Sequence, residues 1–111
     1  MVTNTEISEV FDCPVAATLA IIGGRWKVLI LYQLASGTKR FGEIAVRIPG
    51  ISRKVLTEQL KELEKSKLVV RKQYKEIPPR VEYTLTDLSK GLTPIFDEIA
   101  IWGNKNLLGR G

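Results

Sequence analysis

The 111-residue chain has room for one ordinary domain, and its 44% hydrophobic and 26% charged residues are typical of a protein that buries a core. A single cysteine and no histidine exclude a disulfide framework and the usual zinc sites, and they remove the commonest general base of enzymes. The net charge of +5 is uneven, because residues 25–80 carry 14 basic and 5 acidic side chains between two acidic ends. The resulting net charge of +9 in this segment favours binding of a polyanion such as nucleic acid. The alternative is that these charges only form a solvated surface that keeps the protein soluble.

The N-terminal segment, residues 1–12, has acidic residues and no Lys or Arg, which is the reverse of a signal peptide. The longest apolar run, residues 15–22, is shorter than the roughly 20 residues of a membrane helix. We therefore expect a cytoplasmic protein whose thiol stays reduced. The expected organisation is a tail at 1–12, one domain at 13–104 and a tail at 105–111, with no membrane contact, no metal and no cofactor.

Helical periodicity between glycine and proline breaks predicts four helices in the first part of the chain: 14–22, 25–35, 41–48 and 53–66. Pro14 suits the first position of the first helix, with Cys13 as its N-cap. A very short strand is expected at 38–40. A glycine-containing turn at 49–51 precedes Ser52, which is a preferred N-cap for the fourth helix.

Valine and tyrosine content predicts two strands that form a hairpin, 68–74 and 81–85. The tip between them, residues 75–80, contains two prolines and is framed by basic side chains. After Thr86, helical spacing of apolar residues continues to about Asn104. Either this helix kinks at Pro94, or Thr93 and Pro94 begin a separate final helix.

This order of elements predicts a winged helix-turn-helix, a mainly α fold with a small β-hairpin. The fourth helix carries leucines on one face and basic or polar side chains on the other, so one side packs and the other is free to enter a DNA major groove. The hairpin would contact phosphate or the minor groove. The candidate DNA-binding residues are Ser52, Arg53, Lys54, Thr57, Lys61, Arg71, Lys72, Lys75, Arg80 and Arg40. Each of them taken singly could equally be a solvated surface residue.

The chain also carries a series of short motifs: Cys13-Pro14-Val15, Gly23-Gly24-Arg25-Trp26, Arg40-Phe41, Gly50-Ile51-Ser52, Leu56-Thr57, residues 60–63, Pro78-Pro79-Arg80-Val81-Glu82-Tyr83, Leu85-Thr86 and Trp102. In this order and spacing, across residues 13–103, they resemble the HxlR-type transcriptional regulators. The resemblance implies a homodimeric regulator of bacterial type that binds an operator with two half-sites. Two positions depart from the pattern, since Lys67 and Ser89 stand where the family usually has glycine.

A dimer is also expected on physical grounds. One recognition helix covers few base pairs, whereas a twofold pair places two helices in major grooves about 34 Å apart. The two terminal helices carry more apolar surface than a small core should use. The expected interface residues are Val15, Leu19, Ile22, Ile95, Phe96, Ile99, Ile101 and Trp102. The alternative is that all of them pack within one chain.

Two interpretations of Cys13 stay open. A helix N-terminus favours the thiolate, whereas the neighbouring Asp12 disfavours it. In some members of the resembled family, a cysteine at this position senses oxidants or electrophiles. The other interpretation is a cysteine that only caps the helix and packs.

An enzyme is not expected, because the glycines form no nucleotide-binding motif and the lone cysteine has no histidine partner. The predicted function is a homodimeric DNA-binding transcriptional regulator whose partners are a double-stranded operator and a second copy of itself. The alternative is a winged-helix module that binds a protein or RNA, because a fold does not fix its function.

Overall fold

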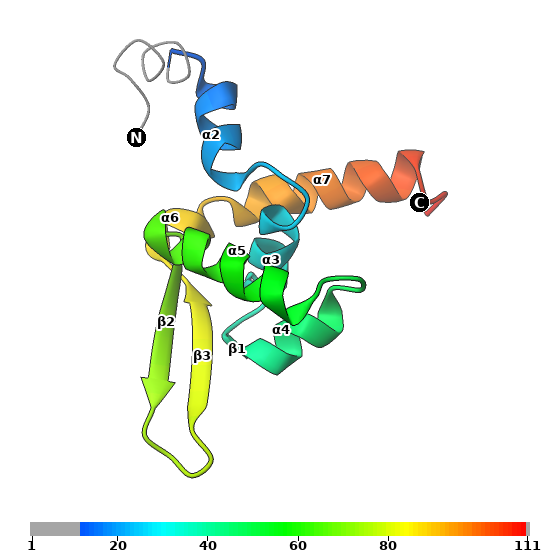
Figure 1. Ribbon diagram of the computed structural model, residues 1–111. Helices are drawn as coiled ribbons and strands as arrows, with labels where there is room; N and C mark the ends of the chain where they lie inside the picture. The colour runs from blue at the N-terminus through cyan, green and yellow to red at the C-terminus, as the bar shows by residue number, and fades with distance from the viewer. Residues whose placement is uncertain (1–11, 111) are drawn as a thin grey trace.

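The computed structural model describes residues 12–110, so all but the last residue of the expected tail at 1–12 lies outside it. The elements follow the chain as α2 (Pro14–Ile22), α3 (Lys27–Leu34), β1 (Lys39–Arg40), α4 (Phe41–Arg47), α5 (Arg53–Lys65), β2 (Val69–Tyr74), β3 (Arg80–Leu85), α6 (Asp87–Lys90) and α7 (Thr93–Asn106). Three central helices lie against a small sheet, and the long β2–β3 hairpin projects from the body (Figure 1). This arrangement confirms the predicted winged helix-turn-helix.

The core lies between α3, α4, α5 and one face of the sheet. Its fully buried side chains come from the helices and from the first residues after α5: Ile30, Leu31, Ile44, Leu56, Leu60, Leu63 and Leu68. Leucines at offsets 0, 4 and 7 of α5 share one face of the helix, and all three are buried. The opposite face of α5 is therefore left to solvent.

Both ends of α5 are fixed by local hydrogen bonds. At its start the Ser52 hydroxyl accepts from the Val55 amide at 3.1 Å, which confirms the predicted N-cap. At its end the Lys67 amide donates to the Glu64 carbonyl and the Leu68 amide donates to the Leu63 carbonyl, both at 2.9 Å. This pair of bonds is a Schellman motif, whose C′ residue is left-handed. Lys67 accordingly has a φ of 62°.

The sheet has three antiparallel strands in the order β1-β3-β2. The predicted short strand and the predicted hairpin thus belong to one sheet. Tyr83 on β3 lies between Arg71 on β2 and Lys39 on β1. Because successive side chains alternate between the faces of a strand, these three share one face, which we call the inner face because Tyr83 packs in the core. Glu82 and its cross-strand partners, Lys72 and Arg40, lie on the outer face.

The boundaries of two helices, α3 and α7, differ from the sequence prediction by up to two residues. α3 begins at Lys27 with Trp26 as its N-cap, rather than at residue 25. Of the two alternatives at Pro94, the separate final helix is correct, but Leu92 is its N-cap and Thr93 is already helical. α7 then continues to Asn106, so the expected C-terminal tail begins inside this helix.

α2 stands away from the rest of the fold (Figure 1). Its axis makes an angle of 83° with that of α3. Two glycines make the turn, because a side chain at Gly23 would collide with the Leu19 carbonyl oxygen and Gly24 has a φ of 97°. Within residues 12–110 no single helix is both long and apolar enough to cross a membrane, and α2 and α3 meet that test only together, as a bent pair.

Candidate nucleic-acid interface

Five of the ten predicted DNA-binding residues lie at the N-cap or on the solvent face of α5. Lys54 and Lys61 are exposed, and neither has a side-chain hydrogen bond or ion pair within the described part of the chain. Arg53 is exposed as well, and its guanidinium lies 4.9 Å from the centre of the Phe41 ring. These three cations are free to meet an external anion.

The two hydroxyls on this helix are already engaged with its backbone. Ser52 accepts at the N-cap, and the Thr57 hydroxyl donates to the Arg53 carbonyl at 2.8 Å. Each hydroxyl keeps acceptor capacity, and the Thr57 methyl group remains available for apolar contact. Both hydroxyls therefore stabilise the first turns of α5, the helix that carries the three cations.

The basic residues of the hairpin are divided between its two faces. Arg71 lies on the inner face, opposite Tyr83 and beside α5. Lys72 and Arg80 lie on the outer face, where the Lys72 ammonium is 4.9 Å and the Arg80 guanidinium 4.0 Å from the centre of the Tyr74 ring. Arg40 pairs with Glu82 in the β1–β3 register and also faces outward. In the sequence these basic residues look like one cluster of charge. Side chains alternate between the faces of a strand, and this alternation places Arg71 on one face and Lys72, Arg80 and Arg40 on the other.

Arg80 is engaged inside the hairpin rather than free. Its Nη2 lies 2.9 Å from the Glu76 carboxylate and its Nε lies 3.6 Å from the Glu82 carboxylate, while its guanidinium covers Tyr74. Two carboxylates offset its charge, so Arg80 braces the hairpin. Lys75 is exposed at the tip, with no ion pair to the residues described.

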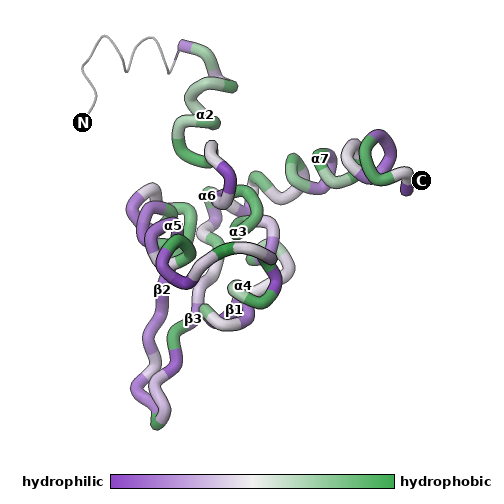
Figure 2. The backbone as a smooth tube through the Cα atoms, turned by 45° about the vertical axis from the view of Figure 1, so that its right-hand side comes forward, coloured by the Kyte–Doolittle hydropathy of each residue, from purple (hydrophilic) through white to green (hydrophobic). Residues whose placement is uncertain are grey.

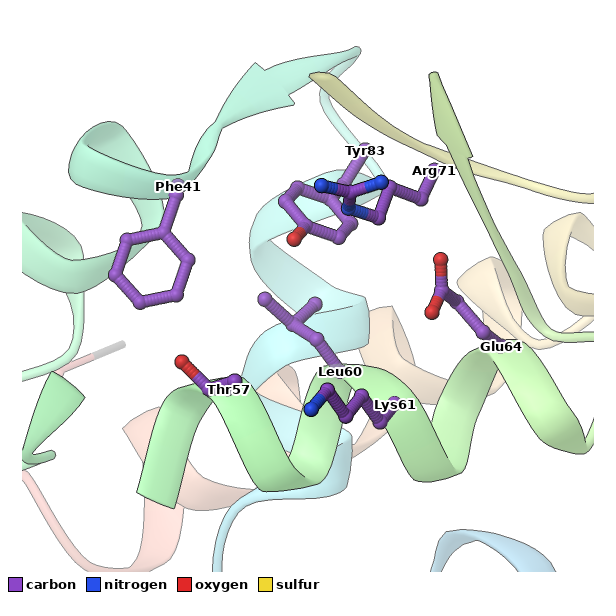
Figure 3. Close-up of a pocket in the computed structure, with 7 residues that line it drawn as sticks. All are labelled: Phe41, Thr57, Leu60, Lys61, Glu64, Arg71 and Tyr83. Atoms are coloured by element: carbon purple, nitrogen blue, oxygen red, sulfur yellow. The ribbon is translucent and has the colours of Figure 1, made fainter. Parts of the chain in front are cut away.

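A cavity of about 340 Å³ lies between α5 and the sheet. It brings together three of the predicted DNA-binding residues with four that were not predicted to bind a ligand: Thr57, Lys61 and Arg71 with Phe41, Leu60, Glu64 and Tyr83 (Figure 3). The sequence places Tyr83 in a strand and in a family motif, and neither assigns it a contact with a ligand. Its place opposite Arg71 follows from the strand register, which the sequence does not give.

Six side chains of α2 and α7 form an exposed apolar patch, each more than half exposed: Val15, Leu19, Ile95, Ile99, Ile101 and Trp102. A hollow of about 350 Å³ lies between the two helices and is lined in part by residues of this patch. Both helices carry apolar stretches along their length (Figure 2). Ile22 and Phe96, predicted for the same interface, are only 6% and 3% exposed. For these two, the alternative of packing within one chain holds.

Cys13 is a free, exposed cysteine directly before α2. It occupies the predicted N-cap position, and its carbonyl accepts from the Ala17 amide at 2.9 Å, but its side chain makes no capping hydrogen bond. The predicted position is correct. The thiol itself does not cap the helix and remains open to solvent.

The chain is similar to known regulators over most of its length. Residues 21–109 match the HxlR-like helix-turn-helix family. YdeP of Bacillus subtilis strain 168, an uncharacterized HTH-type transcriptional regulator, is 46% identical over 93 residues, which are 84% of this chain and 73% of YdeP. A structure from Porphyromonas gingivalis W83, assigned to the MarR family of transcriptional regulators, superposes with a TM-score of 0.83 and 43% identity, covering 96% of this chain and 99% of the other. The redox regulator HypR in its oxidized form superposes with a TM-score of 0.80 and 44% identity over 85% of this chain and 97% of HypR. The chain therefore belongs to the HxlR-like helix-turn-helix family.

Proposed function

We propose that this protein is a DNA-binding transcriptional regulator that binds a two-half-site operator as a homodimer, and we assign it no catalytic role. The observation that carries the proposal is the unpaired cationic face of α5, held outward by the buried leucines of the same helix on a fold shared with HTH-type regulators. We assign this function to one winged helix-turn-helix domain, residues 13–104.

The geometry supports a division of labour between α5 and the hairpin. A 13-residue helix is about 20 Å long and fits the major groove, which is about 12 Å wide. Arg53 and Lys54, near its N-terminus, are suited to guanine O6 and N7, and Thr57 to a base edge or a thymine methyl group. Lys61, Arg71, Lys72 and Lys75 would contact phosphate and set the register on the duplex.

A second copy is the proposed occupant of the apolar patch. Monomeric proteins rarely leave contiguous apolar surface of this kind uncovered. A twofold pair through α2 and α7 would present two α5 helices to one side of a duplex, at the spacing of successive major grooves. The patch and the α5 cations lie on different elements, so one chain can use both at once.

The test is selection of duplexes from a random pool, followed by a salt titration of the selected sequence by fluorescence anisotropy. We expect the logarithm of the binding constant to fall with the logarithm of salt concentration, with a slope of about −0.9 for each phosphate neutralised. A shuffled duplex should bind markedly more weakly. Equal binding to every duplex, or selection of nothing, would favour the protein- or RNA-binding alternative.

Cys13 supports a second, regulatory function. Its thiol is exposed, and two structures similar to this chain are named as forms of a redox regulator. With diamide as oxidant, two Cys13 thiols from two chains would lose two protons and two electrons to the reagent and form one intersubunit disulfide. Non-reducing electrophoresis should then show a covalent dimer in the native chain and none in Cys13→Ser. Release of the selected duplex by diamide from both proteins alike would rule out thiol sensing.

A further inference from the structure

The cavity between α5 and the sheet has walls of two kinds. Phe41 of α4 and Leu60 of α5 supply apolar surface, and the ring of Tyr83 lies across from them (Figure 3). Lys61, Arg71 and Glu64 supply charge around the same space. The lining has two cations and one carboxylate, so it carries a net charge of +1 and favours an anion.

Tyr83 brings a phenol hydroxyl to the wall of this cavity. The residue is only 7% exposed, and its ring belongs to the core. Its hydroxyl points into the cavity in the direction of Phe41 and Thr57 (Figure 3), and it forms no hydrogen bond with another side chain among residues 12–110. Solvent reaches this hydroxyl, so it is free to donate to, or accept from, a molecule bound in the cavity.

The two cations that line the cavity are also without partners. Neither Lys61 nor Arg71 forms an ion pair with another described residue, Glu64 included. Arg71 and Tyr83 are direct cross-strand neighbours on the inner face, so a guanidinium and a phenol hydroxyl approach the space from the same wall. Lys61 approaches it from the facing helix. An anion placed here would receive hydrogen bonds from both sides.

The size and the walls narrow the class of anion. Ligand sites commonly have volumes of about 300 to 1,000 Å³, so a cavity of about 340 Å³ suits a small molecule. Aromatic side chains bind flat rings by stacked or edge-to-face contact. The Phe41 and Tyr83 rings both line the cavity, and Arg53 covers one face of the Phe41 ring. A carboxylate matches the planar fork of Arg71.

We propose that this cavity binds a small aromatic carboxylate, with the ring between Phe41 and Leu60 and the carboxylate held by Tyr83, Arg71 and Lys61. Two of these side chains, Lys61 and Arg71, are the same cations that the proposed function gives to DNA phosphate. A bound carboxylate therefore competes with the duplex, and the small molecule acts as an effector that releases it. This regulatory step rests on the proposed function, whereas the binding site itself does not.

The first experiment is a titration of the full chain with benzoate, without DNA, followed by ¹H–¹⁵N NMR. We expect saturable shifts of the amides of Thr57, Lys61, Glu64, Arg71 and Tyr83. Benzamide has the same shape without the charge, and acetate has the charge without the ring, so both should bind at least about tenfold more weakly. Equal binding of benzamide, or shifts confined to the apolar patch, would overturn the proposal.

Two variants and a matched control test the assigned contacts. Tyr83→Phe keeps the core ring and removes only the hydroxyl, and Arg71→Gln removes the inner-face cation. Each should raise the benzoate Kd by about tenfold, with the rest of the spectrum unchanged. Lys72→Gln removes an adjacent cation from the outer face and should leave the Kd unaltered. If Lys72→Gln has the same effect as Arg71→Gln, benzoate binds the hairpin only as a generally cationic surface, and the proposed site does not exist.

The last experiment tests the effector role separately from the binding of benzoate to the cavity. Benzoate should raise the apparent Kd for the selected duplex in the native chain and not in Tyr83→Phe, with acetate at equal ionic strength as the control. Benzoate binding without any change in duplex affinity would overturn the effector role alone. A chain that binds benzoate at this cavity but selects no duplex would retain the site and refute the proposed function.

Discussion

The hydroxyl of Ser89 donates a hydrogen bond to the carbonyl oxygen of Leu68 at 2.5 Å, and it is buried. Beside it, the Thr86 hydroxyl donates to the carbonyl of Lys67 at 2.8 Å. The start of α6 is thereby tied to the end of α5 and the start of the hairpin. Ser89, one of the two positions at which the chain departs from the glycines of the resembled family, thus bonds to the residue that directly follows the other, Lys67.

The first prediction concerns this link. Ser89→Ala should lower the free energy of unfolding by about 1 kcal/mol, because one buried hydrogen bond is lost while the Leu68 carbonyl still accepts from the Thr86 amide. Urea denaturation at fixed protein concentration measures the change. An unchanged free energy of unfolding would mean that the bond contributes nothing to stability.

The second prediction concerns the end of α5. Lys67→Gly should raise the free energy of unfolding by about 0.5 kcal/mol or more, since a left-handed conformation costs a non-glycine residue about 1–2 kcal/mol and glycine gives part of that back in chain entropy. The matched control is Lys65→Gly, two residues earlier in the right-handed helix, which should lower stability by about 1 kcal/mol. Loss of stability in both variants would contradict the Schellman assignment.

The third prediction separates a brace from a DNA contact in the hairpin. Arg80→Ala removes two ion pairs and the stacking on Tyr74, so amide hydrogen exchange in β2 and β3 should speed up in the free protein. Lys75→Ala, at the exposed tip, should leave exchange unaltered and weaken duplex binding. If Arg80→Ala changes duplex affinity without changing exchange, Arg80 contacts DNA directly.

The fourth prediction tests α5 as the reading helix. Lys54→Ala should weaken binding of the selected duplex by about tenfold, or reduce the salt slope by about 1 if its contact is with phosphate. Lys90→Ala, an exposed lysine on α6, is the control. Lys39 is unsuitable for this purpose, because it is 8% exposed and its ammonium is bonded to Ser36 at 2.8 Å. Equal losses in both variants would count against α5.

The fifth prediction tests the proposed dimer. Trp102→Glu places a charge in the apolar patch and should convert the dimer to monomer in sedimentation experiments, because an unpaired charge in an apolar interface is costly. Leu88→Glu is the control, since Leu88 is similarly exposed but lies on α6, outside the patch. A dimer that persists in Trp102→Glu would place the interface elsewhere.

The fold was predictable because its local signals agree with its packing. Pro14 begins α2, Ser52 caps α5, and Thr86 begins α6 with a side-chain hydrogen bond, as the sequence indicates. Leucine spacing in α5 identifies both its buried and its exposed face. These are short-range properties, and each can be read within one turn of helix.

The arrangement of the site was less predictable, because it depends on pairing across the sheet. A run of basic residues in the sequence does not reveal that Arg71 faces α5 while Lys72 and Arg80 face away. Nor does apolar spacing reveal that Phe96 is used by the core while Trp102 is left outside. Register and the share of apolar surface that the core consumes are tertiary properties.

The projection of α2 has a consequence for how the protein folds. This helix has nine residues and buries only Ile22, whereas isolated helices shorter than about 12 to 15 residues are barely stable in water. In the proposed dimer, α2 would make most of its packing contacts with the second chain. The folding of α2 would then be coupled to the association of the two subunits. Dilution would then unravel the amino-terminal turns before the central fold, and the melting temperature would rise with protein concentration.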